Sequence, residues 1–432
     1  MKRKIEEKLF QWKQKKNRKP LILNGARQVG KTYILRAFGE KYYKNMVYVN
    51  LEINETIASF FESNIAPERL IQYLEASTGE RIVPGETLII LDEIQACERA
   101  LTSLKYFCED TPEYHIVAAG SLLGVAINRA RYSFPVGKVE TMTLYSLDFE
   151  EFLWAMKEDF LCNEIRNSYK GMTALVEALH QKAIERYRQY LIVGGMPACI
   201  NQFMESGKLL DIPLVQNEIM NNYLADMAKY AENASSVKIR ACFNSIQAQL
   251  AKENKKFQYK VVQKGGTATI FGEAIEWLNA AGVVLKCQKT EQGNEPVSAY
   301  VDLASFKLYM CDVGLLVMKS GIMQQTILSG MGNTFLGAVT ENYVATQLAA
   351  NGYDLFYWES EYSAELDFVT FDQSGRYAIE VKKGEHNKSK SLNQFIKKYN
   401  PENVYRFSLK NFGYENGIHA VPLYAIFCME KK

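Results

Sequence analysis

The stretch GARQVGKT, Gly25 to Thr32, constrains the fold more than any other part of this sequence. It fits the pattern G-x-x-x-x-G-K-[ST] at every fixed position, between the apolar run PLILN and a helical pattern. Glycines in such a turn let backbone N–H groups approach a phosphate, and the start of the following helix adds its dipole. A chance match in a glycine-containing turn would not need that flanking strand and helix. The sequence therefore predicts a phosphate-binding loop in a parallel α/β sheet.

This loop predicts a nucleotide site with a bound magnesium ion. Lys31 is expected to reach the β- and γ-phosphates of ATP, and Thr32 is expected to ligate Mg²⁺. The predicted nucleotide-binding residues are Gly25, Ala26, Arg27, Gln28, Val29, Gly30, Lys31 and Thr32.

A second run, TLIILDEIQ, places two acids at the carboxyl end of a buried strand, where ligands of α/β sheets bind. Asp92 suits a magnesium ligand, and Glu93 suits the base that polarises the attacking water. Two acids capping a helix are the alternative. Ser121 follows the next strand, where it could sense the γ-phosphate or cap the helix after it.

Arg129 and Arg131 lead into the segment SFPVGK. Either arginine could act as a finger on the γ-phosphate, in cis or in trans within a homo-oligomer, or be a plain surface residue.

The order of elements indicates more than one domain in the 432 residues. An amphipathic helix carrying Ile5, Leu9 and Trp12 precedes four strand-like runs, PLILN, MVYVNLE, TLIILDEIQ and HIVAAGSLLG. Helical patterns dominate after about Asp148. Strands return after Gly352 with LFYWES, ELDFVTF, YAIEVKK, NVYRFSL and YAIFCME.

The composition excludes several classes of protein. The formal net charge of +2 means that a nucleic-acid partner would be held by local basic patches only. The eight cysteines form no C-x-x-C pair, which disfavours a zinc site or a disulfide scaffold. No signal peptide is apparent, and no apolar run reaches the roughly 18 residues that span a bilayer. We expect a reduced, cytoplasmic, soluble protein without a membrane partner.

The ordered set GARQVGKT, LDEIQ, AGSLLG, SFPVGKVE, LYSLDFEEFL and GGMP resembles a family of prokaryotic AAA+-type P-loop ATPases, related to the archaeal-type and signal-transduction ATPases. The later FKLYMCDVGLL and GAVTENYVA, with AELDFV and AIEVKKG, resemble that family's C-terminal half. The resemblance spans nearly the whole chain. It implies an ATP hydrolase followed by a domain of unknown function with winged-helix and restriction-endonuclease-like parts.

The C-terminal strands carry acids in a pattern that suits a metal. If the turn at 372–375 closes a hairpin, Phe371 pairs with Arg376, and Asp367 then faces Glu380. Opposed acids repel, and a divalent cation would relieve the repulsion. Glu365 would face Lys382 in the same register.

These acids resemble the PD-(D/E)XK nuclease motif, which implies Asp367 and Glu380 as ligands of Mg²⁺ or Mn²⁺, and Lys382 as the group acting on the scissile phosphate. Leu366 stands where the motif has proline. Glu341 matches an additional acid on the family's first helix, where a carboxylate on an apolar face needs a partner. The alternatives are a hairpin with a solvated charged face, and a nuclease fold that binds DNA without cutting it.

The middle region could recognise DNA. Lys255, Lys256, Lys260 and Lys264 precede GGTATIFGEAIEWL, which has the pattern of a recognition helix followed by a wing. A helical lid on the ATPase is the alternative.

These features together predict three units: a P-loop ATPase at 1–200, a mostly helical winged-helix region at 201–330 and a small α/β nuclease-like domain at 331–432. The function expected is Mg²⁺-dependent ATP hydrolysis coupled to DNA binding, with metal-dependent cutting as a further activity. The alternative is a nucleotide-gated regulatory scaffold, with an inert nuclease fold and a protein partner.

Overall fold

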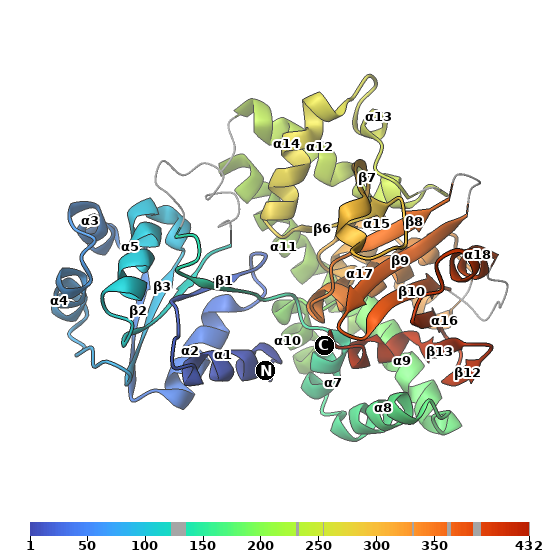
Figure 1. Ribbon diagram of the computed structural model, residues 1–432, viewed down its shortest axis with the longest axis horizontal. Coiled ribbons are helices and arrows are strands. Elements are labelled where there is room, and N and C mark those ends of the chain that lie inside the picture. The colour runs from blue at the N-terminus through green and yellow to red at the C-terminus, as the bar shows by residue number, and fades with distance from the viewer. Residues whose placement is uncertain are drawn as a thin grey trace. The chain divides into compact units, whose positions relative to one another are not determined.

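The computed structural model describes residues 1–121, 135–229, 233–253, 255–330, 332–360, 364–382 and 390–431. The chain divides into two compact units (Figure 1). The N-terminal unit comprises Lys2–Tyr145 and Ala280–Gly282, and the C-terminal unit comprises Ser146–Asn279 and Val283–Lys432, with Met1.

The N-terminal unit is built on a five-stranded parallel sheet in the order β2-β3-β4-β1-β5. Its strands are β1 (Leu21–Asn24), β2 (Asn45–Asn50), β3 (Thr87–Asp92), β4 (His115–Ala119) and β5 (Glu140–Thr143). The first four confirm the strands predicted from sequence. β5 has the sequence ETMT, alternately exposed and half-buried, so its apolar pattern is too weak to mark an edge strand.

Helices cover both faces of this sheet (Figure 1). One apolar cluster joins alternate strand residues such as Ile89 and Leu91 to the inner sides of three helices, α3 (Glu55–Ser63), α4 (Pro67–Thr78) and α5 (Glu98–Glu109). The intervening strand residues point to the other face, where α1 (Ile5–Gln14) and α2 (Lys31–Tyr42) lie. The first predicted helix is thereby confirmed, with Ile5, Leu9 and Trp12 buried.

The C-terminal unit begins with helices, as predicted after Asp148. Asp148 caps the first of them reciprocally with Glu151, which satisfies backbone N–H groups that a helix start leaves free. The helices of this unit are α7 (Phe149–Ala155), α8 (Asp159–Gly171), α9 (Glu177–Val193), α10 (Pro197–Ser206), α11 (Ile212–Lys229), α12 (Asn233–Leu250), α13 (Tyr259–Val262), α14 (Ala268–Ala280, ending in the N-terminal unit), α15 (Val313–Ser320), α16 (Gln324–Ser329), α17 (Leu336–Ala350) and α18 (Lys390–Tyr399).

A mixed sheet of eight strands, in the order β12-β13-β11-β10-β9-β8-β6-β7, forms the rest of this unit. The antiparallel ribbon that follows α14 belongs to the same sheet as the last hundred residues, so the region predicted as a wing and the predicted nuclease-like end share one sheet. The strands are β6 (Val284–Thr290), β7 (Val301–Met310), β8 (Phe356–Glu359), β9 (Glu365–Asp372), β10 (Gly375–Val381), β11 (Asn403–Ser408), β12 (Gly413–Glu415) and β13 (Ile418–Pro422). The division into three domains stays a prediction.

Two helices cover opposite faces of this sheet. α18 packs Leu392 and Phe395 against Val369 and Ala378, which are paired across β9 and β10. The next residue pair, Phe368 and Ile379, points to the opposite face of the sheet. On that face, which α17 covers, the ring centroids of Phe368 and Tyr309 are 5.9 Å apart.

One predicted strand is wrong. YAIFCME lies mainly in a 3₁₀ helix, η4 (Leu423–Cys428), in which Leu423–Phe427 are all buried. A short, wholly apolar run has no period that separates a buried strand from a buried helix. Shorter 3₁₀ turns are η1 (Ile94–Ala96), η2 (Leu209–Asp211) and η3 (Val297–Tyr300). Within the described ranges, no helix has the length and apolar character needed to cross a membrane.

Candidate functional site

The predicted phosphate loop joins β1 to α2 and depends on glycine at two points. Gly25 has a φ of 144°, and a Cβ at this position would lie 2.2 Å from the carbonyl oxygen of Leu144. Gly30 has a φ of 96° directly before the first residue of α2. Both φ values are strained for residues with a side chain, which explains glycine at these two positions. At Gly25 the absence of a side chain also lets the loop backbone lie close to Leu144.

Lys31 is folded back over this loop. Its buried ammonium donates hydrogen bonds to the carbonyl oxygens of Gly25 at 3.0 Å and Ala26 at 2.9 Å. Burial lowers the pKa of Lys31 to about 8, against the opposing effect of Glu93 and Asp92. The two carbonyls carry no net charge, so Glu93 and Asp92 compensate the ammonium only in part, and a phosphate bound in the loop would complete the compensation. The residues of the loop therefore fit a nucleotide.

Asp92 is held by three donors at the end of β3. Its Oδ2 accepts from Thr32 Oγ1 at 2.6 Å and from Tyr48 OH at 2.9 Å, and its Oδ1 accepts from the backbone N–H of Glu93 at 3.0 Å. Burial, together with the negative Asp92, raises the pKa of Tyr48 to about 12, so the phenol remains a donor. The hydroxyl of Thr32 and the carboxylate of Asp92 meet at one point, and they are oxygen donors of the kind that Mg²⁺ prefers.

Glu93 follows in a left-handed conformation, with a φ of 52°. Its Oε2 accepts a hydrogen bond from Nε2 of Gln95. Ser121 is buried just beyond β4, the strand next to β3, so Glu93 and Ser121 lie at the same edge of the sheet. Arg129 and Arg131, as well as the helix that Ser121 was expected to cap, lie outside the described residues.

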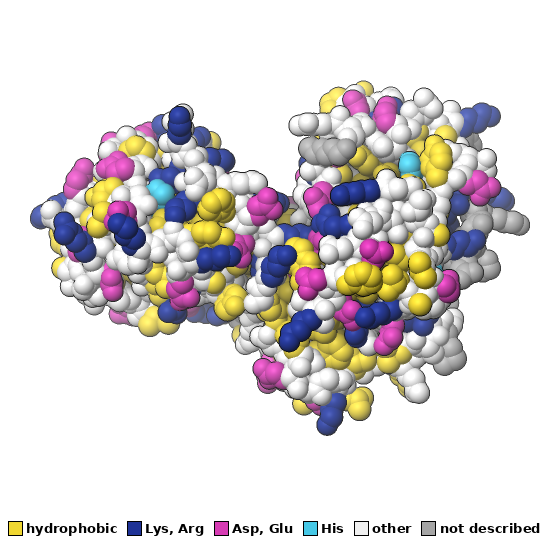
Figure 2. All heavy atoms as spheres, turned by 90° about the horizontal axis from the view of Figure 1, so that it is seen from below, with side chains coloured by type: hydrophobic (Ala, Val, Ile, Leu, Met, Phe, Trp, Pro, Cys, Tyr) yellow, Lys and Arg dark blue, Asp and Glu magenta, His cyan; other side chains and the backbone are white. Residues whose placement is uncertain are grey.

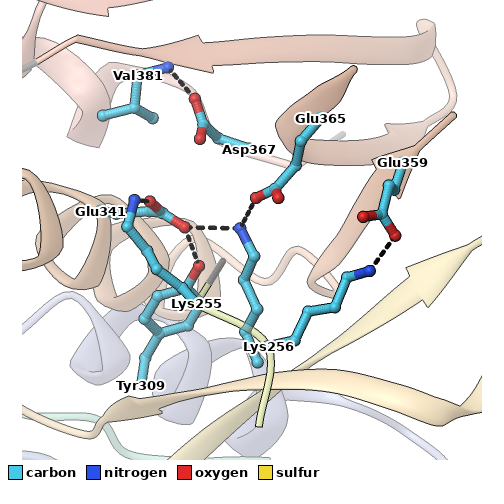
Figure 3. A network of polar contacts seen from close by, with 9 residues as sticks. Lys255, Lys256, Tyr309, Glu341, Glu359, Glu365, Asp367 and Val381 are labelled. Atoms are coloured by element: carbon cyan, nitrogen blue, oxygen red, sulfur yellow. Dashed lines mark hydrogen bonds and ion pairs between the residues drawn. The ribbon is translucent and has the colours of Figure 1, made fainter. Parts of the chain in front are cut away.

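The second candidate site lies in the C-terminal unit. One carboxylate oxygen each from Glu341, Glu365 and Asp367 lies within 4.8 Å of the others (Figure 3). A β-bulge places Asp367 there: between the pairs Phe356–Val369 and Trp358–Leu366, β9 advances three residues while β8 advances two. The extra residue changes the direction of the side chains around it.

Lysines supply positive charge to this acidic cluster. The Nζ of Lys307, which is fully buried on β7, lies 2.9 Å from Glu341 and also pairs with Glu365. Lys255 binds the other oxygen of Glu341, and Tyr309 donates to Glu341 as well (Figure 3). The expectation that Glu341 needs a partner on its helix face is confirmed.

The pKa values follow from these contacts. Burial alone would raise the pKa of Glu341, but Lys255 and Lys307 outweigh it and lower that pKa to about 2. Burial would also lower the pKa of Lys307, but the neighbouring carboxylates outweigh it and raise that pKa, with Glu341 contributing the most. Burial and the neighbouring Glu341 raise the pKa of Asp367 to about 7, although its Oδ2 accepts a hydrogen bond from the backbone of Val381 at 2.7 Å.

Glu380 makes contacts of its own. The predicted register of the hairpin, with Phe371 opposite Arg376, is confirmed. The carboxylate of Glu380 contacts Lys382 at 3.0 Å and Arg406 at 3.4 Å. The structure thus groups Asp367 with Glu341 and Glu365, and it places Glu380 against two cations. The metal-binding roles of Asp367, Glu380 and Glu341 stay predictions.

Sequence reasoning missed Lys307 and the place of Glu365 in the cluster. A signal was present for Lys307, because its neighbours in SFKLYM are apolar or aromatic and a lysine within a buried strand requires an anionic partner. The place of Glu365 depends on the bulge that follows it in β9, and a bulge cannot be counted from sequence.

Two of the four lysines expected to contact DNA form ion pairs within the chain. Lys255 binds Glu341, and Lys256 binds Glu359 on β8 (Figure 3). The exposed side of α14 carries Glu273 and Glu276. Acids on a recognition helix would repel phosphates, and Lys255 and Lys256 already form ion pairs within the chain. Contact of Lys260 and Lys264 with DNA stays a prediction.

Comparisons with known proteins agree with this order of parts. Residues 17–153 match an AAA domain family, residues 184–326 match a domain of unknown function (DUF8612), and residues 336–426 match another (DUF4143). No curated protein matches the chain significantly.

Similar solved structures include the Walker-type ATPase PABY2304 of Pyrococcus abyssi. It is 14% identical, with 74% of this chain and 95% of that chain covered and a TM-score of 0.45. The ORC1 protein of Aeropyrum pernix, solved in complex with DNA, is 11% identical over 73% of this chain and 90% of that chain, with a TM-score of 0.28. By these matches, the N-terminal part of the chain is similar to AAA domains, and the two regions that follow it are similar to families of unknown function.

Proposed function

We propose that the N-terminal unit binds ATP with Mg²⁺ and hydrolyses it. The observation that carries this proposal is the convergence of Lys31, Thr32 and Asp92 at the phosphate loop, with Glu93 one residue further on. Lys31 would exchange its carbonyl partners for phosphate oxygens. Thr32 and Asp92 would hold Mg²⁺, which when bound supplies positive charge to the β- and γ-phosphates. Glu93 would take a proton from the attacking water.

Two variants test this proposal. Lys31→Ala should remove nucleotide binding, because it deletes the charge that faces the phosphates. Glu93→Gln should bind ATP with unchanged affinity and hydrolyse it at least about 10²-fold more slowly. Lys44→Ala is the control, since Lys44 forms an exposed ion pair with Glu86. Hydrolysis by Glu93→Gln at the wild-type rate would show that Glu93 is not the base.

We further propose that the C-terminal unit binds DNA through α18. Basic and acidic side chains are interspersed on the face shown in Figure 2, so binding would depend on a local patch. The exposed side of α18 is one: Lys390, Lys397 and Lys398 share it with Asn393 and Gln394, and no acid lies in the helix. Leu392, Phe395 and Tyr399 fix the opposite side to the sheet. Such a surface suits phosphates.

Salt dependence tests the DNA proposal on the full chain. Lys397→Glu with Lys398→Glu should weaken binding for every DNA sequence and reduce the dependence of affinity on salt, because fewer counterions are released. Lys105→Glu with Lys208→Glu changes the net charge equally at exposed positions elsewhere. Equal losses in both double variants would mean that the net charge, and not α18, governs binding.

The ion pairs of the acidic cluster bear on the metal-dependent cutting of DNA that the sequence predicts. Lys255 and Lys307 supply positive charge where a divalent cation would supply it. This favours the second candidate function, a nucleotide-gated scaffold with an inert nuclease-like fold and a protein partner. Incubation of the full chain with varied DNA substrates and Mg²⁺ or Mn²⁺, with and without ATP, distinguishes a nuclease from a scaffold that does not cut DNA. Cleavage that Asp367→Asn abolishes would establish the nuclease.

A further inference from the structure

The side chain of Gln95, in η1 directly after β3, has two amide ends with different surroundings. Its Nε2 donates to Oε2 of Glu93. A carboxylate only accepts hydrogen bonds, so this contact identifies which end of the amide is nitrogen. The amide therefore fixes one oxygen of Glu93 and leaves the other oxygen, Oε1, to bind a different group.

The carbonyl end of Gln95 is a buried acceptor. Among the described residues, its Oε1 has no hydrogen-bond partner. It lies against Gly120, where an added Cβ would come within 2.5 Å of it. A buried acceptor without a partner destabilises the folded chain, so a group that binds there is expected.

The location suggests which group that is. Gly120 directly follows β4 and precedes Ser121, and β4 lies between β3 and β1 in the sheet. The carboxyl ends of these three strands therefore bring together Glu93, the carbonyl of Gln95 and the phosphate loop after β1. This is the edge at which the γ-phosphate and its attacking water would be bound.

We propose that Gln95 is a catalytic residue for ATP hydrolysis, in which its Oε1 accepts one hydrogen of the attacking water while Glu93 accepts the other. The proposal rests on the ATPase function proposed above. A water molecule whose two hydrogens are both bound presents a lone pair to the phosphorus, and orienting it in this way removes rotational freedom before the reaction.

The step balances as follows. The water oxygen forms a bond to the γ-phosphorus while the bond from that phosphorus to the bridging oxygen breaks, and ADP leaves with the electron pair. The hydrogen directed at Glu93 transfers to its carboxylate as a proton. The hydrogen bound by Gln95 stays on the phosphate product. Glu93 then releases its proton to solvent.

Two variants test Gln95 by different routes. Gln95→Ala removes both contacts, whereas Gly120→Ala keeps the amide and places a methyl group against its carbonyl oxygen. Each should lower kcat about 10²-fold while the ATP dissociation constant and the melting temperature stay near the wild-type values. Gln72→Ala, on the exposed side of α4, should leave all three unchanged.

A second measurement does not depend on turnover. ADP with aluminium fluoride mimics the phosphorus with its attacking water, so both variants should bind this complex more weakly while binding ATP normally. If either variant folds and binds ATP but keeps wild-type kcat and wild-type affinity for this complex, the role of Gln95 is wrong. If Gln95→Ala does not fold, Gly120→Ala decides. A wild-type chain that hydrolyses no ATP would instead refute the ATPase function itself.

Discussion

The Nζ of Lys307 lies 2.9 Å from Oε1 of Glu341, and both side chains are almost completely removed from solvent, with exposed fractions of 0% and 2%. Each charge stabilises the other in a place where either alone would be costly. The two residues lie on β7 and α17, so the ion pair joins a strand to the helix that covers it.

Lys307→Met should therefore destabilise the C-terminal unit strongly. Removing one partner leaves a buried carboxylate with reduced compensation, which typically costs about 3–5 kcal/mol. Urea unfolding followed by tryptophan fluorescence measures the loss, because Trp154, Trp277 and Trp358 all lie in this unit. Adding Glu341→Gln to Lys307→Met should restore part of the stability. A single variant as stable as the wild type would show that the pair contributes little.

His115 makes the stability of the N-terminal unit depend on pH. Burial, reinforced by the positive Arg18 and Lys13, lowers the pKa of His115 to about 4, and its Nδ1 lies 2.7 Å from the hydroxyl of Tyr43. The unfolded chain, with an ordinary histidine pKa of about 6.5, then binds more protons than the folded chain between pH 4 and 6.5. The stability due to this group is present above pH 6.5 and falls on acidification by about 1.4 kcal/mol per pH unit.

Thermal unfolding at pH 7.5, 6 and 5 checks this dependence. His115→Gln should lose less stability than the wild type between pH 6.5 and 5, whatever its stability at pH 7.5. Tyr43→Phe is the control, because it removes the hydroxyl and leaves the histidine in place. Parallel curves for the wild type and His115→Gln would mean that His115 titrates normally in the folded chain.

The sequence predicted those parts of the structure that depend on local pattern. The glycine spacing of the phosphate loop, the apolar strand ending at Asp92 and the helical face of Glu341 each contain their own signal. The acidic cluster depends on longer-range features. The bulge in β9 sets the direction of Asp367, and β7 brings Lys307 to Glu341 from 34 residues away. No local pattern encodes a bulge or a partner at that distance.

Gly25→Ala should weaken ATP binding. A methyl group at this position would meet the carbonyl oxygen of Leu144, and the φ of 144° is strained for alanine, so the loop must shift away from its phosphate-binding conformation. Gly85→Ala is a matched control, since Gly85 also has a positive φ, 73°, but a Cβ there meets nothing within 4 Å. Titration with a fluorescent ATP analogue should show at least a tenfold weaker affinity in Gly25→Ala only. Equal affinities would show that the loop tolerates the methyl group.

Lys255→Gln should make the acidic cluster responsive to metal. Three carboxylates share two ammonium groups in the wild type, and this variant removes one of them while Lys307 remains. The excess negative charge then favours a divalent cation, and a ligand that binds only the folded state raises the melting temperature.

The melting temperature, recorded once in Mn²⁺ and once in EDTA, measures this response. The difference between the two should be larger for Lys255→Gln than for the wild type, and Asp367→Asn should remove the gain when it is added to Lys255→Gln. Lys256→Gln is the matched control, because this neighbouring lysine pairs with Glu359, which is not one of the three clustered acids. If Lys255→Gln and Lys256→Gln respond equally to Mn²⁺, the added affinity does not arise at Glu341, Glu365 and Asp367. The cluster would then be a buried ion-pair network that stabilises the fold without binding a metal.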